Sequence, residues 1–266
     1  ELMDREAKTS DGARDLPVAG AGSVAFDNVT FGYAADDPVL RDLSFRVEPG
    51  RVLGLLGRTG SGKTTITRLL FRLYDTDSGV VSIDGVDIAA ARTSEVRRRV
   101  AMVTQDVHLF RASLRDNLSL FAREVDDEAI VSVLADLGLG DWYAALPDGL
   151  DSVLESKGVG MSAGQQQLLA FARVFLRDPG IVVLDEPSSR LDPGTEQRVE
   201  AAVARLLAGR TGIIIAHRLE TLRRVDDILI LDDGRIAEWG PRVELAADSG
   251  SRFAGLLRTG MDEELS

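Results

Sequence analysis

The sequence predicts an α/β fold with a parallel-sheet core, an N-terminal antiparallel β layer and a helical subdomain. Three observations predict this. A dense apolar strand, Val52–Leu56, leads into a glycine-rich turn and then a helical pattern from Lys63. Before it, Val24–Tyr33 and Leu43–Val47 alternate as strands do. Over residues 112–175, by contrast, apolar residues recur three and four positions apart, which is typical of helices.

The order of these patterns predicts the domain organisation. Residues 1–22 are polar, rich in alanine and glycine and without periodicity, so we expect a linker or tail. One domain then covers 23–260, with the helical subdomain at about 112–175, and residues 261–266 form a tail. The chain begins at Glu1 without an initiator methionine, which leaves open that it is cut from a longer polypeptide.

Composition excludes several classes of function. The formal net charge is −12, whereas general nucleic-acid binding needs clustered Lys and Arg, so we expect no nucleic-acid partner. There is no cysteine, which excludes disulfides and thiolate metal sites, and two histidines are too few for a histidine-built metal centre. No apolar run reaches the length of a membrane span and no secretory signal opens the chain, so we expect a soluble, cytosolic domain.

The glycine-rich turn matches the phosphate-binding pattern G-x-x-x-x-G-K-[ST], the P-loop, at every fixed position. Its backbone N–H groups and the helix that follows can cradle phosphate oxygens. Lys63 would reach the β- and γ-phosphates, and the Thr64 hydroxyl would hold Mg²⁺. A turn that merely joins strand to helix explains the bend but not the lysine, one of only three in the chain. The predicted phosphate-binding residues are Gly57, Arg58, Thr59, Gly60, Ser61, Gly62, Lys63, Thr64 and Thr65.

A second apolar strand, Ile181–Leu184, ends in the carboxylates of Asp185 and Glu186. By itself this pattern is more typical of a solvated strand end. Beside a P-loop it indicates an ATPase, in which Asp185 binds Mg²⁺ through water and Glu186 polarises the attacking water. The two motifs together predict a P-loop NTPase that uses ATP and Mg²⁺.

The segment Met161–Gln165 reads M-S-A-G-Q and resembles the L-S-G-G-Q signature of ABC transporters, with Asp185 23 residues after Ser162 as in that family. From Ala163 to Asp192 the sequence resembles the family's stretch from signature through D-loop nearly throughout, and the resemblance covers about residues 23–258. The chain thus resembles the ATPase domain of an ABC transporter.

The resemblance implies further roles. Tyr33 matches the aromatic residue that stacks on adenine, and Gln105 matches the glutamine that contacts Mg²⁺ and the attacking water. His217 matches the histidine that contacts the γ-phosphate, and Asp192 matches the D-loop residue that communicates across a dimer. Taken singly, Tyr33 reads as an ordinary strand tyrosine, Asp192 as a helix N-cap before Pro193, and His217 as a structural residue.

The signature segment implies a partner domain. Ser162 can cap the helix that begins at Ala163, and the helix N-terminus forms a second anion site with Gly164 and Gln165. In the family that site faces the P-loop of a second ABC ATPase domain, so that each ATP lies between two domains. The resemblance therefore implies a dimer that closes on ATP and opens after hydrolysis.

The segment after Gln105 points to exporters within the family. It reads Q-D-V-H-L-F and then S-L-R-D-N-L, which resembles the exporter pattern, and implies that Leu109 and Phe110 contact the transmembrane domain, unless both are core residues. The implied function is the ATP-hydrolysing motor of an exporter, at the cytoplasmic face of the cell membrane and attached through a transmembrane domain.

Two other classes of function fit the sequence less well. A non-transport ABC ATPase usually carries a long coiled-coil insertion, whereas only 57 residues separate Gln105 from Ser162, without heptads. A regulatory module without hydrolysis is opposed by Glu186 and His217.

The sequence also departs from the family pattern. Ala163 adds a Cβ where the family has glycine, and Leu154–Gly158 matches the exporter X-loop poorly. Because the P-loop is intact while the signature is altered, a heterodimer is the favoured hypothesis over a homodimer.

Overall fold

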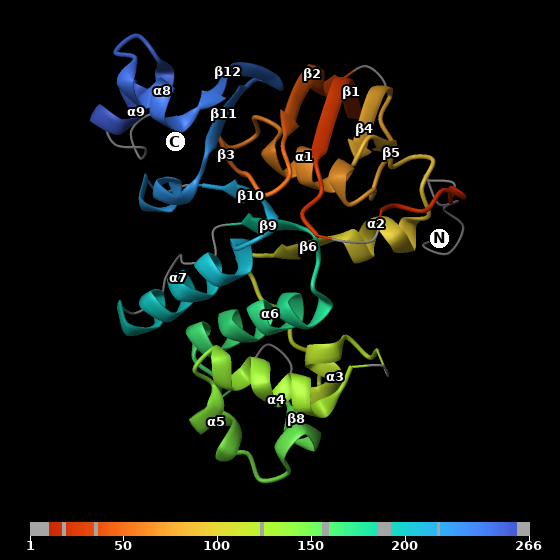
Figure 1. Cartoon of the computed structure of the whole chain (residues 1–266), viewed down its shortest axis with the longest axis vertical. Coiled ribbons are helices and arrows are strands. Elements are labelled where there is room, and N and C mark those ends of the chain that lie inside the picture. Colours follow the sequence, from red (N-terminus) through yellow and green to blue (C-terminus); the bar gives the residue numbers. More distant parts are fainter. Residues whose placement is uncertain are drawn as a thin grey trace. The chain divides into compact units, whose positions relative to one another are not determined.

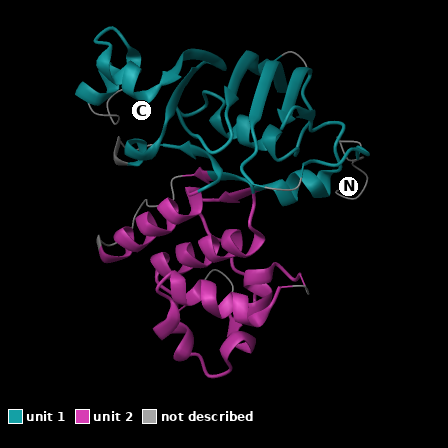
Figure 2. Ribbon diagram, in the orientation of Figure 1, with its two compact units in different colours: residues 1–100, 180–183, 209–266 teal, residues 101–179, 184–208 magenta. Residues whose placement is uncertain are grey.

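The computed structural model describes residues 11–17, 20–34, 37–122, 125–155, 160–185, 193–216 and 219–259. The chain divides into two compact units (Figure 2). Unit 1 contains residues 1–100, 180–183 and 209–266, and unit 2 contains residues 101–179 and 184–208.

The N-terminal β layer is a four-stranded sheet in unit 1, with the strand order β2-β1-β4-β5. Its strands are β1 (Val24–Ala34), β2 (Asp37–Val47), β4 (Ser78–Ile83) and β5 (Val86–Asp87), and the first two lie side by side in Figure 1. β1 pairs antiparallel with both β2 and β4. The predicted antiparallel layer is therefore confirmed, and β4 and β5 complete it.

The core is a six-stranded sheet with the order β12-β11-β3-β10-β9-β6. The strands are β3 (Val52–Gly57), β6 (Val100–Val103), β9 (Ile181–Asp185), β10 (Thr211–Ile215), β11 (Asp227–Asp232) and β12 (Arg235–Pro241). β3 runs parallel to β10 and β11, and every residue of β3 and β10 is buried. A strand buried on both faces forms a continuous apolar run, which is why β3 was visible in the sequence. β12 pairs antiparallel with β11, so the sheet is mixed rather than purely parallel.

The helical elements follow the same division. In unit 1 they are α1 (Lys63–Leu70), α2 (Thr93–Arg99), η3 (Leu219–Arg224), α8 (Arg242–Ala247) and α9 (Arg252–Thr259). In unit 2 they are α3 (Leu114–Ser119), α4 (Asp127–Asp136), α5 (Gly140–Ala144), η1 (Gly149–Asp151), α6 (Ala163–Arg177) and α7 (Pro193–Leu207). Unit 2 also has a short ladder of β7 (Ala112–Ser113) with β8 (Val153–Leu154). No helix within the described ranges is both long and apolar enough to cross a membrane.

Part of the segment predicted as a linker contacts other residues of unit 1. The backbone N–H of Thr93 donates to Asp11 Oδ1 at 2.7 Å, and this bond holds the pKa of Asp11 below its usual range. Arg14 N donates to Ala90 O at 2.9 Å, and Leu16 is buried. Asp11 and Leu16 contribute side chains and Arg14 its backbone, but no periodicity in the segment marks these contacts.

Candidate active site

The P-loop joins β3 to α1 inside unit 1. Gly57, Gly60 and Gly62 have φ of 145°, 85° and 110°, a region that side-chain-bearing residues rarely adopt. A Cβ on Gly57 would lie 2.4 Å from Leu231 O, and one on Gly62 would lie 2.6 Å from Leu40 Cδ2. Two of the glycines are therefore required by space as well as by backbone conformation.

The first turn of α1 is arranged for an anion. Its N-cap is Gly62, and no side chain that the structure describes caps it. The N–H groups of such a turn have no intrahelical acceptors, and the helix dipole favours negative charge there. Ser61 is buried, and its Oγ has no hydrogen-bond partner in the described part of the chain. These donors fit a phosphate group.

Lys63 supplies the positive charge of the loop. Its side chain is buried, and Nζ donates to the carbonyl oxygen of Gly57 and, at 2.9 Å, to that of Arg58. The ammonium is thus held inside the loop rather than extended into solvent. Arg58, Thr59 and Gly60 are exposed at the turn.

Two threonines follow Lys63 and differ in their surroundings. Thr64 is exposed, so its hydroxyl is accessible to a ligand, whereas Thr65 is buried. Thr65 Oγ1 lies 3.1 Å from Tyr33 Oη, near the end of β1. The Tyr33 ring is 41% exposed. The structure thus places Tyr33 beside the P-loop helix, which is the arrangement that an adenine-stacking role requires.

The signature residues belong to unit 2, where α6 begins. As the sequence predicts, Ser162 is the N-cap: its Oγ accepts from Gln165 N at 3.1 Å, while Ser162 N donates to Gln165 Oε1 at 2.9 Å. Gly164 is buried, and a Cβ there would lie 1.9 Å from Thr195 Cγ2 of α7. The glycine is therefore required by the packing of α6 on α7, a reason that the sequence did not reveal.

The remaining predicted site residues fall into two groups. Gln105 is an exposed residue after β6, and Asp185 is a half-buried residue that ends β9; both belong to unit 2. Glu186, Asp192 and His217 lie outside the described residues, as does most of the Leu154–Gly158 segment. Among the residues that are described, no group of three or more His, Cys, Asp or Glu could hold a metal.

The two predicted contact residues of the exporter-like segment, Leu109 and Phe110, differ in exposure. Leu109 is buried, whereas Phe110 is 48% exposed and its ring centroid lies 5.5 Å from that of Phe121. Buried Asn117 holds Phe110 in place, because Phe110 N donates to its Oδ1 at 2.8 Å and its Nδ2 donates to Phe110 O at 2.9 Å. Only Phe110 is thus available as a surface contact.

Two arginines support these residues and were missed by sequence reasoning. Arg173 of α6 donates to His108 O at 2.9 Å and to Asn117 O at 2.8 Å, and burial lowers the pKa of its guanidinium. Arg68 of α1 donates from Nη1 to Tyr33 Oη at 2.8 Å. Both contacts join positions far apart in sequence, and an arginine on a helix carries no mark of such a partner.

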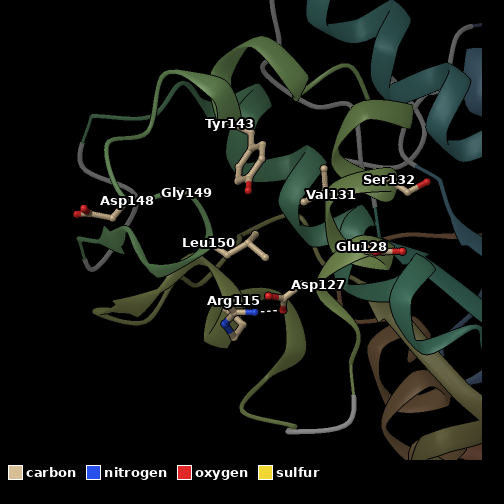
Figure 3. A pocket seen from close by; sticks show the side chains of 9 residues that line it. All are labelled: Arg115, Asp127, Glu128, Val131, Ser132, Tyr143, Asp148, Gly149 and Leu150. Carbon is tan, nitrogen blue, oxygen red and sulfur yellow. Dashed lines mark ion pairs between the residues drawn. The ribbon is translucent and has the colours of Figure 1, made fainter.

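Unit 2 has a pocket that is lined by residues outside the predicted site (Figure 3). Its volume is about 610 Å³, and Arg115 forms an ion pair with Asp127 at its wall. None of the predicted site residues lines it. It gives no support to an alternative active site, since its polar side chains include an ion pair that is already satisfied.

Comparison with known proteins decides the family. A protein-family model described as "ABC transporter" matches residues 40–189, a range that includes the P-loop, the signature segment and β9. The chain belongs to the ABC transporter family. Its fold is that of the family's ATPase domain, and the resemblance stated from the motifs is confirmed.

The chain is similar to longer members of the family, exporters among them. It is 36% identical to an "ATP-dependent lipid A-core flippase" of Alcanivorax borkumensis over 99% of the chain and 45% of the relative. It is 38% identical to human "ATP-binding cassette sub-family B member 6" over 94% of the chain and 30% of the relative. A solved "bacterial Atm1-family ABC exporter with ATP bound" superposes with a TM-score of 0.87 at 36% identity, covering 97% of this chain and 45% of that one. The chain thus spans less than half the length of these relatives.

Proposed function

We propose that the chain is the ATP-hydrolysing motor domain of an exporter, driving transport by attached transmembrane domains. The observation that carries the proposal is the P-loop geometry. An uncapped helix N-terminus, a buried ammonium and a buried hydroxyl without a partner among the described residues converge at one turn. A triphosphate supplies the negative charge and the acceptor oxygens that this turn requires.

The chain's own residues divide the work on the triphosphate. Lys63 and the loop N–H groups bind and orient the β- and γ-phosphates, and Tyr33 stacks on the adenine. Glu186 positions the attacking water and accepts its proton, while His217 contacts the γ-phosphate. Thr64, Gln105 and Asp185 would hold Mg²⁺, which when bound neutralises charge on the phosphate oxygens. The exposed Thr64 and the carboxylate and amide oxygens of the other two fit that hard cation.

Pairing with a second ABC ATPase domain completes the site in this proposal. The N-terminus of α6, with Ser162, Gly164 and Gln165, contributes to the nucleotide bound by the partner domain. Ala163 is exposed at this terminus, so its Cβ faces whatever binds there and weakens that contact. A heterodimer, in which the partner domain carries the unaltered signature, follows from this difference. A homodimer of the chain that hydrolyses ATP at full rate would contradict it.

The transmembrane domain is the second proposed partner. Phe110 is exposed, and hydrogen bonds from Asn117 and Arg173 hold the backbone of its segment in place. Such a fixed, exposed ring suits an apolar contact. The domain would then lie at the cytoplasmic face of the cell membrane. The exporter relatives support an attached transmembrane domain, since this chain matches only one part of these longer proteins.

Substitution of Glu186 tests the proposed hydrolysis. Glu186→Gln keeps the shape of the side chain but removes the carboxylate, so ATP binding is retained while turnover falls by about two orders of magnitude or more. The measurements are equilibrium ATP binding and phosphate release. Glu244→Gln, an exposed residue of α8, is the control and leaves both unchanged. Unchanged turnover in Glu186→Gln would remove that residue from its assigned role.

A further inference from the structure

Arg68 on α1 has a specific contact that no sequence motif assigns. Its Nη1 donates to Tyr33 Oη at 2.8 Å, and its guanidinium carbon lies over the Tyr33 ring, 5.6 Å from the centroid. The contact thus combines a charge-assisted hydrogen bond with a cation–π interaction. Both residues belong to unit 1 and lie on different elements, β1 and α1.

The hydroxyl of Tyr33 is bound to α1 at two points. An arginine nitrogen can only donate, so Tyr33 Oη accepts from Arg68, and its own hydrogen is available for Thr65 Oγ1 at 3.1 Å. Thr65 and Arg68 are three residues apart and therefore share a face of the helix. The same helix begins at Lys63, so the ring that meets the base is tied to the turn that meets the phosphates.

The position of Tyr33 explains why a tie matters. It is the second-last residue of β1, and its ring is 41% exposed. Phe31 and Tyr74 contact the ring edge-to-face, with centroids 5.1 and 5.3 Å away. A ring at a strand end that was not held at its hydroxyl would lose rotamer freedom when a base stacked on it. Ordering the ring beforehand lowers that cost and so raises affinity.

We propose that Arg68 is a positioning residue for the nucleotide base: it holds the Tyr33 ring against α1 in the orientation on which a base stacks. The inference rests on the proposed nucleotide function and adds to it a residue that acts through Tyr33. Arg68 therefore affects ligands that carry a base and leaves the binding of phosphate groups alone. It also links occupation of the base site to the helix that carries the P-loop.

Two probes separate these effects in the purified protein: ATP, and inorganic tripolyphosphate, which lacks a base. Arg68→Ala weakens ATP binding about threefold to tenfold and changes tripolyphosphate binding by less than about twofold. Arg68→Lys keeps one donor without the planar group and gives an intermediate loss of ATP affinity. Arg46→Ala, which removes an exposed charge from β2 of the same unit, serves as the control and changes neither.

A double-mutant cycle shows whether Arg68 acts through the Tyr33 hydroxyl. Tyr33→Phe keeps the ring and removes the acceptor of the hydrogen bond. In that background the effect of Arg68→Ala on ATP binding shrinks to within about twofold, since only the cation–π contact is left to lose. In turnover assays Arg68→Ala raises KM for ATP and leaves kcat unchanged.

Three results would overturn the inference. Arg68→Ala could bind ATP as tightly as the wild type or more tightly, which would make the contact neutral or an obstacle to the base. It could lose affinity for ATP and tripolyphosphate equally, which would assign Arg68 to the phosphates. Its effect could persist in full in the Tyr33→Phe background. A wild-type protein that binds neither probe contradicts the proposed function itself, which is a separate outcome.

Discussion

Helix α1 of unit 1 begins at Gly62, without a side-chain cap in the described structure, whereas helix α6 of unit 2 begins at Ser162, inside a complete capping box. Both helix termini belong to motifs that the sequence assigns to nucleotide phosphates. The two termini differ in whether a side chain already accepts a hydrogen bond from a first-turn N–H group. At α1 the N-cap residue Gly62 makes no side-chain cap, while at α6 the Gln165 N–H and the Ser162 hydroxyl already bond to each other.

The difference indicates a division of roles. An anion that reaches α1 meets a helix terminus whose N-cap residue offers no competing side-chain acceptor, and it meets the Lys63 ammonium as well. An anion that reaches α6 must share or replace the bonds of the capping box, and the first helical residue there, Ala163, has no charge. The P-loop end can therefore hold a phosphate by itself, whereas the α6 end adds a contact to a phosphate held elsewhere. This agrees with the proposed site shared between two domains.

The largest effect is expected at the α1 terminus. Lys63→Ala removes the ammonium, and with it about two charge-assisted hydrogen bonds to phosphate of about 1.5–3 kcal/mol each, so ATP affinity falls about 100-fold or more. Equilibrium ATP binding is the measurement. Arg235→Ala, an exposed residue of β12, removes the same charge from unit 1 and is expected to leave affinity within about twofold. An equal loss in both variants would mean that net charge, and not the position of Nζ, controls binding.

A smaller effect, on stability, is expected at Gly164. Gly164→Ala places a Cβ 1.9 Å from Thr195 Cγ2, so α6 and α7 must shift and unfolding becomes easier by about 1–3 kcal/mol. Adding Thr195→Ser removes the Cγ2 and recovers about half of that loss. Urea denaturation measures both changes.

Gly140→Ala is the matched control for this packing. Its Cβ would come no closer than 3.8 Å to Ala135 Cα, so stability changes by less than about 0.5 kcal/mol. A Gly164→Ala protein as stable as the wild type would show that the glycine is required for the ligand alone.

The smallest effect tests the capping box directly. Ser162→Ala removes the Oγ that accepts from Gln165 N and lowers the free energy of unfolding by about 1 kcal/mol, while Ser162→Gly costs only a few tenths. Urea denaturation is again the measurement. Ser132→Ala, an exposed serine inside α4, provides the comparison and is expected to stabilise slightly, since alanine is the better helix former. If Ser162→Ala and Ser132→Ala behaved alike, the two helix termini would not differ as described.

The features that the sequence predicts correctly depend on residues close together along the chain. The P-loop turn is set by glycines two or three positions apart, and the capping box by Ser162 and Gln165, three positions apart, so both were visible as short patterns. The strands β3 and β9 were visible because strands buried on both faces form continuous apolar runs. The roles assigned to Glu186 and His217 stay predictions, since these residues lie outside the described ones.

Other features were decided by contacts between distant positions. Leu109 and Phe110 are adjacent and both apolar, yet Leu109 is buried and Phe110 is exposed. Asn117 and Arg173 determine this difference, because they bond to the backbone of Phe110 and His108 and so fix the conformation of the segment. Residues 11–17 lack any pattern and still pack on unit 1. In each case the partner lies on another element, and neither residue of the pair indicates the other in the sequence.

The sequence by itself determined that a P-loop joins a buried strand to a helix and that Ser162 caps a second helix, because each of these depends on residues within one or two turns. It also determined that the chain resembles ABC exporters, because short motifs occur in the order and spacing of that family. Only the tertiary structure decided that Gly164 is required by Thr195 and that Arg68 holds Tyr33. The physical reason is that these depend on the space and donors that other elements leave at a site, which are set when the chain packs.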